Sequence, residues 1–207
     1  MLPVATIHRV IDQPAVDFSV KPTLTGEKVM LRPFITDDIP ALRAAVQDPE
    51  VLRLTGSVHG DETEFAGGDP ARDEQFRQWR NAQPDRLDLA VVDKASGQCV
   101  GEVVLNKWDE GNRSCNFRTL LGPTGRDRGL GTESLRMIVG YGFEQLGLHR
   151  ISLEVYAFNP RARHVYEKVG FVAEGVLREE LRYRDEWIDA TVMSILAHEW
   201  ARHRGWP

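Results

Sequence analysis

The spacing of hydrophobic and polar positions changes several times along the chain, and each change predicts a new element. Short apolar or alternating runs predict strands at residues 28–32, 87–92, 99–105, 114–121, 151–158, 171–176 and 187–196. Apolar residues at intervals of three and four predict helices at about 37–48, 71–82, 129–147 and 159–170. The order β-α-α-β-β-β-α-β-α-β-β therefore predicts an α/β (α+β) protein, with a mixed, mostly antiparallel sheet of about seven strands and about four flanking helices.

The same pattern divides the chain into one domain and two short ends. Residues 1–23 lack periodicity and contain three prolines, so we expect an N-terminal arm or tail. Residues 24–200 carry the periodic elements and form the predicted domain, which leaves 201–207 as a C-terminal tail. Residues 55–70 are polar and rich in glycine, which predicts a loop inside the domain.

Composition excludes several classes of protein. With 207 residues, of which 42% are hydrophobic, one core is large enough to need no metal or disulfide. The net charge of −5 disfavours a general nucleic-acid binder, and no apolar run approaches the roughly 20 residues of a membrane helix. No secretory signal is expected at the N-terminus. Cys99 and Cys115 show no metal-binding spacing, so we expect reduced packing residues in a cytoplasmic protein, without a metal site.

One segment, Gly122 to Glu133, predicts a ligand site. It lies between a strand and a long helix, where glycines allow close approach of a ligand and the helix start offers free N–H groups. Arg126 and Arg128 add positive charge, so the segment suits a pyrophosphate. It lacks the Gly-Lys-Ser/Thr of a P-loop and the spacing of a dinucleotide fingerprint, but it fits R-x-x-G-x-G. A glycine-rich helix start capped by solvent remains the alternative.

The order of motifs resembles the GNAT superfamily of acetyl-CoA-dependent N-acetyltransferases. R-x-x-G-x-G is followed by a long helix, a strand, and Asn-Pro-Arg-Ala-Arg-His-Val-Tyr-Glu-Lys-Val-Gly-Phe at residues 159–171. The opening Val-Met-Leu-Arg-Pro at 29–33 and the Glu-Gly-Val-Leu-Arg at 174–178 resemble the RimJ/RimL-like branch, which acetylates ribosomal-protein N-termini. This resemblance covers about residues 24–200 and implies acetyl-CoA as cosubstrate.

The resemblance also implies roles for individual residues in binding CoA. Backbone amides of the loop would hold the pyrophosphate, with a threonine at the helix start; the residues concerned are Arg126, Asp127, Arg128, Gly129, Leu130, Gly131 and Thr132. The strand ending at Leu120 and Leu121 would pair with the pantetheine arm in a V-shaped opening of the sheet. Asn159 would reach that arm with its side chain, or would serve only as the helix N-cap.

The resemblance assigns the acid of the reaction more firmly than the base. Tyr166 matches the usual general acid and would at least donate a hydrogen bond to the departing thiolate, although its position on an apolar stripe also suits a core residue. Asn116 stands where many relatives carry a glutamate. Glu102 and Glu154, in neighbouring predicted strands, are the substitutes, or else ordinary strand residues.

These residues predict direct attack of a primary amine on acetyl-CoA in a ternary complex. A protein or peptide N-terminus is favoured, because about a tenth of an α-amino group is neutral at pH 7 without a strong base. The alternatives are a small amine such as an antibiotic or a polyamine, and a degenerate acyl-CoA sensor. Asp61, Glu62 and Glu64 would attract a cationic amine, or would form a solvated loop. A homodimer is left open.

Overall fold

The computed structural model describes residues 16–57 and 70–203, which form an eight-stranded sheet in the order β1-β2-β3-β4-β5-β6-β8-β7. The strands are β1 (Leu24–Thr25), β2 (Val29–Arg32), β3 (Leu87–Asp93), β4 (Cys99–Asp109), β5 (Ser114–Leu121), β6 (Arg150–Tyr156), β7 (Val172–Tyr183) and β8 (Glu186–Leu196). The α-helices are α1 (Ile39–Gln47), α2 (Pro49–Leu54), α3 (Pro70–Ala82), α4 (Leu130–Glu144), α5 (Pro160–Val169) and α6 (Ala197–His203). All strand pairs are antiparallel except β5 with β6, which confirms the predicted mixed sheet.

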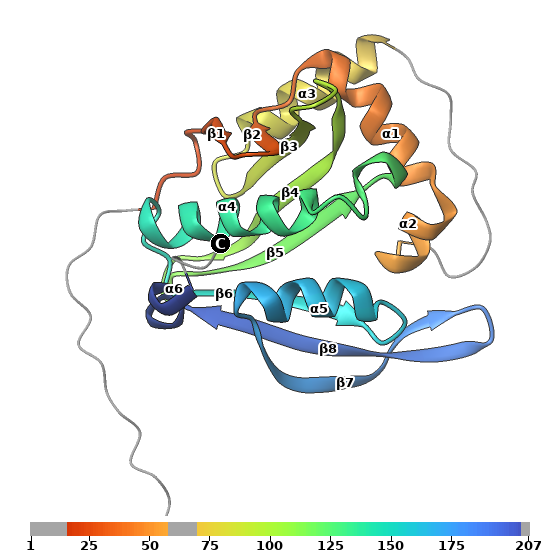
Figure 1. Cartoon of the computed structure of the whole chain (residues 1–207), viewed down its shortest axis with the longest axis vertical. Coiled ribbons are helices and arrows are strands. Elements are labelled where there is room, and N and C mark those ends of the chain that lie inside the picture. The colour runs from red at the N-terminus through yellow and green to blue at the C-terminus, as the bar shows by residue number, and fades with distance from the viewer. Residues whose placement is uncertain (1–15, 58–69, 204–207) are drawn as a thin grey trace, which may run out of the picture.

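Helices cover both faces of this sheet. Figure 1 shows α4 and α5 on one face, with α1 and α3 behind β2 to β5. The larger core lies under α4, α5 and α6, where Leu135, Ile138 and Ile151 are fully buried. A smaller core lies under α1 and α2 and includes Leu42, Val51 and Leu120. Alternate residues of β4 and β5 thus face two different layers.

The parallel pair at the centre of the sheet separates soon after it forms. Strands β5 and β6 pair only through Ser114–Asn116 and Arg150–Ser152, and their remaining residues have no mutual register. The rest of β5 stays paired with β4 along its other edge. An edge of β5 that no neighbouring strand pairs is thereby left inside the sheet, and this agrees with the V-shaped opening that the resemblance implied.

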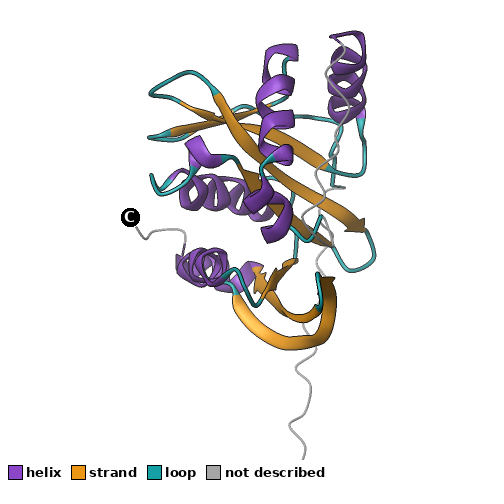
Figure 2. Cartoon of the chain, turned by 90° about the vertical axis from the view of Figure 1, so that its right-hand side faces the viewer, coloured by secondary structure: helices purple, strands orange, loops and turns teal. Residues whose placement is uncertain are grey.

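Short elements with little periodicity are where the structure adds to the sequence prediction. The two-residue β1 is too short to show a pattern, and Asp48 begins α2 by accepting a hydrogen bond from Val51 N instead of only ending α1. Strand β7 runs seven residues beyond the predicted end at 176. The sequence did not predict this extension, because nearly all residues of β7 are exposed and show no alternation of apolar and polar positions. Figure 2 shows β7 and β8 as a strongly curved hairpin at one end of the molecule.

Both expected ends of the domain carry ordered contacts in the structure. Phe18 is buried in the larger core against Trp108, and Lys21 Nζ donates to three backbone carbonyls, of Phe18, Gln83 and Arg86. Helix α6 crosses the expected boundary at residue 200, where Trp200 is buried and donates to Glu144. Residues of both predicted tails, within 16–23 and 201–203, are therefore described as part of the fold. No helix in the described ranges is long and apolar enough to cross a membrane.

Candidate active site

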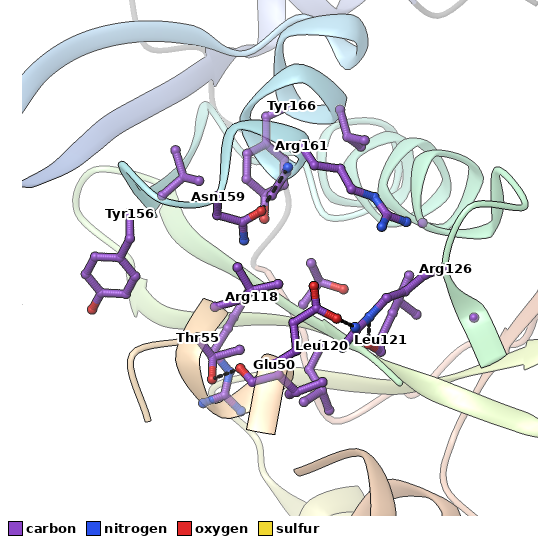
Figure 3. Close-up of a pocket in the computed structure, with 18 of the residues that line it drawn as sticks. Glu50, Thr55, Arg118, Leu120, Leu121, Arg126, Tyr156, Asn159, Arg161 and Tyr166 are labelled. Carbon is purple, nitrogen blue, oxygen red and sulfur yellow. Dashed lines mark hydrogen bonds and ion pairs between the residues drawn. The ribbon is translucent and has the colours of Figure 1, made fainter. Parts of the chain in front are cut away.

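A cavity of about 600 Å³ occupies the opening between β5 and β6 and extends to α2, α4 and α5. Figure 3 shows Arg126, Glu50 and Leu121 on one side and Asn159, Arg161 and Tyr166 of α5 on the other. Most of the sequence-predicted site residues line it, namely Glu102, Leu120, Leu121, Arg126, Asp127, Gly129, Gly131, Thr132, Glu154, Asn159 and Tyr166. Arg128 and Leu130 do not.

The start of α4 forms one end of this cavity. Gly129 is the N-cap and has a φ of 81°, which a side chain would strain. A Cβ on Gly131 would lie 2.9 Å from the Leu121 Cδ1 atom, so a larger residue would close the gap between helix and strand. The first turn of an α-helix has N–H groups without intrahelical acceptors. This end therefore suits an anion such as a pyrophosphate.

The two arginines of the loop do not act as the free cations that the sequence predicted. Arg126 is paired with Glu50 and Asp48 of the α2 region, and its Nε donates to Leu121 O at 3.0 Å. Arg128 turns away to Asp93, 2.8 Å distant. Leu130, also predicted at the site, packs in the larger core with 1% exposure. The anion end consequently depends on backbone N–H groups rather than on loop side chains.

Asn159 is the N-cap of α5 and also lines the cavity. Its Oδ1 accepts a hydrogen bond from Ala162 N at 3.1 Å, which makes it the N-cap of α5. Its side chain also lines the cavity (Figure 3). The cap uses only the oxygen, so the amide N–H groups remain available to a ligand.

Tyr166 lies at the inner end of the cavity. Its ring packs edge-on against Phe117 and contacts Phe171, at centroid distances of 6.2 and 6.0 Å. Burial raises the pKa of Tyr166 to about 12, so the hydroxyl keeps its proton throughout the neutral range. The residue is thus part of the core and a wall of the cavity at once.

Glu102 lies beside the cavity but is held by arginines. Its carboxylate is paired with Arg80 of α3 and accepts from Arg118 Nη2 at 3.0 Å. Arg80 also contacts the buried Asp88 at 3.1 Å, and Arg86 contacts the same carboxylate at 2.7 Å. With both oxygens occupied, Glu102 is poorly placed to accept a proton from a substrate.

Sequence reasoning missed the arginines of this network. Arg80 shared the helical spacing of Phe76 and Trp79, and only 5% of it is exposed. Asp88 and Glu102 stand within mostly apolar strands. A charged residue at an apolar position needs an opposite charge nearby, and this was the available signal.

Glu154 is an exposed carboxylate that lines the opening and is not bound by an arginine of the described residues. Its neighbours Leu153 and Val155 belong to the larger core, so Glu154 points to the opposite face of the sheet. It lines the cavity and makes no ion pair among residues 16–57 and 70–203. Asn116, at the last paired position before the opening, faces Ser152 in register. Asp61, Glu62 and Glu64 lie outside the described residues.

Neither cysteine is placed for nucleophilic chemistry. Cys99 and Cys115 are both buried, and burial raises their pKa values to about 11 and about 12. A thiol with such a pKa is almost fully protonated at neutral pH. Neither residue lines the cavity.

Comparison with known proteins points to one family. A sequence model of the Acetyltransferase (GNAT) domain matches residues 28–172. Spermidine N(1)-acetyltransferase of Escherichia coli K12 is 30% identical over 121 residues, which span 58% of this chain and 65% of that enzyme. A Bacillus subtilis relative, provisionally named ribosomal N-acetyltransferase YdaF, is 26% identical over 65% of this chain and 74% of its own length.

Solved structures share the fold. The crystal structure of spermidine N-acetyltransferase from Vibrio cholerae, in complex with CoA and spermine, aligns with a TM-score of 0.71 at 24% identity. The alignment covers 84% of this chain and 98% of the Vibrio cholerae chain. The E. coli spermidine enzyme, by contrast, is matched over less than two thirds of its length.

Proposed function

We propose, from the premise that this chain belongs to the GNAT acetyltransferase family, that it transfers the acetyl group of acetyl-CoA to a primary amine. One observation carries the proposal. The sheet opens beside the start of α4, and the cavity there combines an anion-binding helix end, an unpaired strand edge and a protonated tyrosine. These three features match the three parts of an acyl-CoA, which are its pyrophosphate, its amide-bearing arm and its sulfur.

The residues of the opening fit acetyl-CoA as cosubstrate. Backbone N–H groups from Asp127 to Thr132 would hold the pyrophosphate. The unpaired edge of β5 near Leu120 would pair with the pantetheine amides, as an added strand would. The Asn159 amide would donate to the same arm. Acetyl-CoA supplies an already activated acyl group, so this chain's task is to place amine and thioester together.

Tyr166 acts in this proposal as a hydrogen-bond donor to the departing thiolate. Complete proton transfer from a phenol of pKa about 12 to a thiolate of ordinary pKa would be uphill by about 5 kcal/mol. A hydrogen bond from the same hydroxyl stabilises negative charge on sulfur without that cost. Packing against Phe117 and Phe171 holds the ring, and with it the hydroxyl oxygen, in one place.

We assign the proton-accepting role to Glu154 rather than to Glu102. Glu154 has no arginine partner among the described residues and faces the opening, whereas both Glu102 oxygens are bound. A carboxylate at this point would orient an ammonium group and take its proton, directly or through a water. Asn116 cannot serve as a base, because an amide side chain does not accept a proton near neutral pH.

Two classes of acceptor are supported by different observations. The name of the E. coli relative supports a small amine, and that of YdaF supports an acceptor on the ribosome, with which a protein N-terminus is compatible. An α-amino group is the easier nucleophile for a site with one carboxylate, because its pKa near 8 leaves part of it neutral. We therefore favour an α-amine and keep the small amine as the second candidate.

The proposed function is tested by thiol release from acetyl-CoA. Purified protein is mixed with acetyl-CoA and a panel of peptides and small amines, and acetylated product is confirmed by mass spectrometry. We expect release that depends on an amine. Tight CoA binding without such release would contradict the transferase and favour the sensor.

The role of Glu154 predicts a large effect in the same assay. Glu154→Gln is expected to lower kcat/KM at pH 7 by about a hundredfold, because it removes the base but keeps the shape. The loss should shrink at higher pH, where the amine deprotonates in solution. Glu167→Gln, which removes a carboxylate from the outer face of α5, is the matched control. Equal rates in Glu154→Gln and wild type would rule out this assignment.

A further inference from the structure

We propose that the acceptor carries an anionic group close to its amine, and that Arg118 binds this group, with Arg53 as a second cation of the same cavity. The inference rests on the proposed function and names the class of its acceptor. It follows from where these two side chains lie and from how the charges around the cavity are paired.

Arg118 and Glu154 are placed to hold two ends of one small group. Asn116 and Ser152 are the last register partners of β5 and β6, and Arg118 and Glu154 each follow two positions later. Phe117 contacts Tyr166, so Arg118 points to the other face of the sheet, as Glu154 does. One cation and one anion therefore face each other across the mouth of the opening, on the side away from Tyr166.

The charge around Arg118 is positive on balance. Arg80, Arg86 and Arg118 share only two carboxylates, those of Asp88 and Glu102. The carboxylates and Arg80 are buried, whereas the Arg118 side chain is 55% exposed and lines the cavity. Arg118 donates to the buried Glu102 carboxylate through one nitrogen, Nη2, which leaves further N–H donors of the guanidinium for a ligand. The excess charge of the network is thus presented to the cavity.

Arg53 adds a second cation to the lining of the cavity, from α2. Its guanidinium stacks over Phe158 at 4.7 Å from the ring centroid and lies 5.9 Å from that of Tyr183. It lines the cavity from α2 and has no carboxylate partner among the described residues. The aromatic rings orient this charge without neutralising it.

The other charged residues of the cavity are paired with each other. Arg126 lies between Glu50 and Asp48, which leaves one excess negative charge at the α2 end, and Arg161 lies 2.8 Å from Asp127. The remaining charged groups of the lining are Glu154 and Arg53, which have no ion-pair partner among the described residues, and Arg118, which shares Glu102 with Arg80. A polyamine would bring several positive charges to this side and find one partner. An amine with a carboxylate or another anion nearby would satisfy all three side chains.

Matched pairs of acceptors test this class. One pair is 4-aminobutyrate and its amide, 4-aminobutanamide, and the other is the tetrapeptide amides Ala-Asp-Asp-Ala and Ala-Asn-Asn-Ala, with spermidine as the polycation. We expect kcat/KM with acetyl-CoA to favour the anionic member at least about tenfold, as a charge-assisted hydrogen bond would give. Acetylation of the aminobutyrate pair would identify the acceptor as a small molecule, and acetylation of the tetrapeptide pair would identify it as a peptide terminus.

Variants connect the preference to Arg118. Arg118→Gln should bring the ratio of anionic to neutral acceptor close to one, and Arg118→Lys should keep part of it, because a lysine keeps the charge but not the planar fork. Arg163→Gln makes the same charge change on the exposed surface of α5 and should leave the ratio unchanged. Unfolding midpoints show whether each variant is folded. If Arg118→Gln does not fold, the ratio of kcat/KM for anionic and neutral acceptors in the wild type decides by itself.

The outcomes separate this inference from the function on which it rests. Neutral amines or spermidine used as well as anionic ones would overturn the inference and leave the transferase intact. So would an unchanged ratio in folded Arg118→Gln. If no amine of the panel gave amine-dependent thiol release, the proposed function would be overturned, and the inference with it.

Discussion

Replacing Arg80 with methionine is expected to lower the free energy of unfolding by about 3–5 kcal/mol. Arg80 contacts both Asp88 and Glu102, whose side chains are 0% and 5% exposed. Methionine fills much of the same volume but leaves two buried carboxylates with less positive charge beside them. Breaking a buried pair from one side leaves an uncompensated charge, so the cost exceeds the net contribution of the pair itself.

Urea unfolding followed by circular dichroism measures this loss. Arg77→Met is the matched control, since Arg77 lies on the same helix and pairs with Glu74 at the surface. Its effect should be much smaller, because an exposed ion pair contributes little. If both variants lost the same small amount, the network under Arg118 would be solvated, and the charge arrangement argued above would be wrong.

Tyr166→Phe should lower kcat by about a hundredfold and leave the KM for acetyl-CoA nearly unchanged. The hydroxyl is proposed to act on sulfur only as the bond breaks, so its loss affects the transition state rather than substrate binding. Phenylalanine keeps the contacts with Phe117 and Phe171, so the fold should tolerate it. Because the pKa of Tyr166 is raised to about 12, wild type and variant should show the same pH profile between pH 6 and 9.

Steady-state kinetics with saturating amine checks this prediction. Tyr141→Phe removes a hydroxyl from α4, outside the cavity lining, and should retain wild-type kcat. A Tyr166→Phe variant with wild-type kcat would show that the tyrosine is only a core residue. If the pH profile of kcat in wild type changed between pH 6 and 9 and the variant lacked that change, Tyr166 would titrate in the neutral range, contrary to its burial.

Local patterns were enough to predict the central elements and half of the site. The interval of three and four between Ala162, Val165, Tyr166 and Val169 located α5 and the tyrosine, and Asn159-Pro160 located its start. The glycines at 129 and 131 likewise located the start of α4. Such features depend on neighbours within one or two turns, which a sequence displays directly.

Contacts between distant segments were not predictable in the same way. Arg126 meets residues 48 and 50, and Arg128 meets Asp93, so two charges that the sequence assigned to a phosphate are used elsewhere. Glu102 is taken by Arg80 and Arg118. A single sequence shows that a charge is present but does not show which partner neutralises it. That is why the two candidate bases, Glu102 and Glu154, could be told apart only with the structure, whereas Tyr166 was proposed from the sequence alone.

Short elements were not predicted from the sequence for a different reason. Strand β1 has two residues and α6 has seven, and neither length shows a repeating pattern. Trp200 fixes α6 through a buried ring and a bond to Glu144, which only tertiary packing reveals.

The opening between β5 and β6 is proposed to hold an acyl-CoA, and thermal unfolding with CoA tests this binding most directly. Binding to the folded state alone stabilises it by RT ln(1 + [L]/Kd), about 2.7 kcal/mol at a hundredfold excess over Kd. For a domain of this size we predict a rise of about 5–10 °C in the unfolding midpoint. No rise at millimolar CoA would contradict the account, because both the transferase and the sensor require this site.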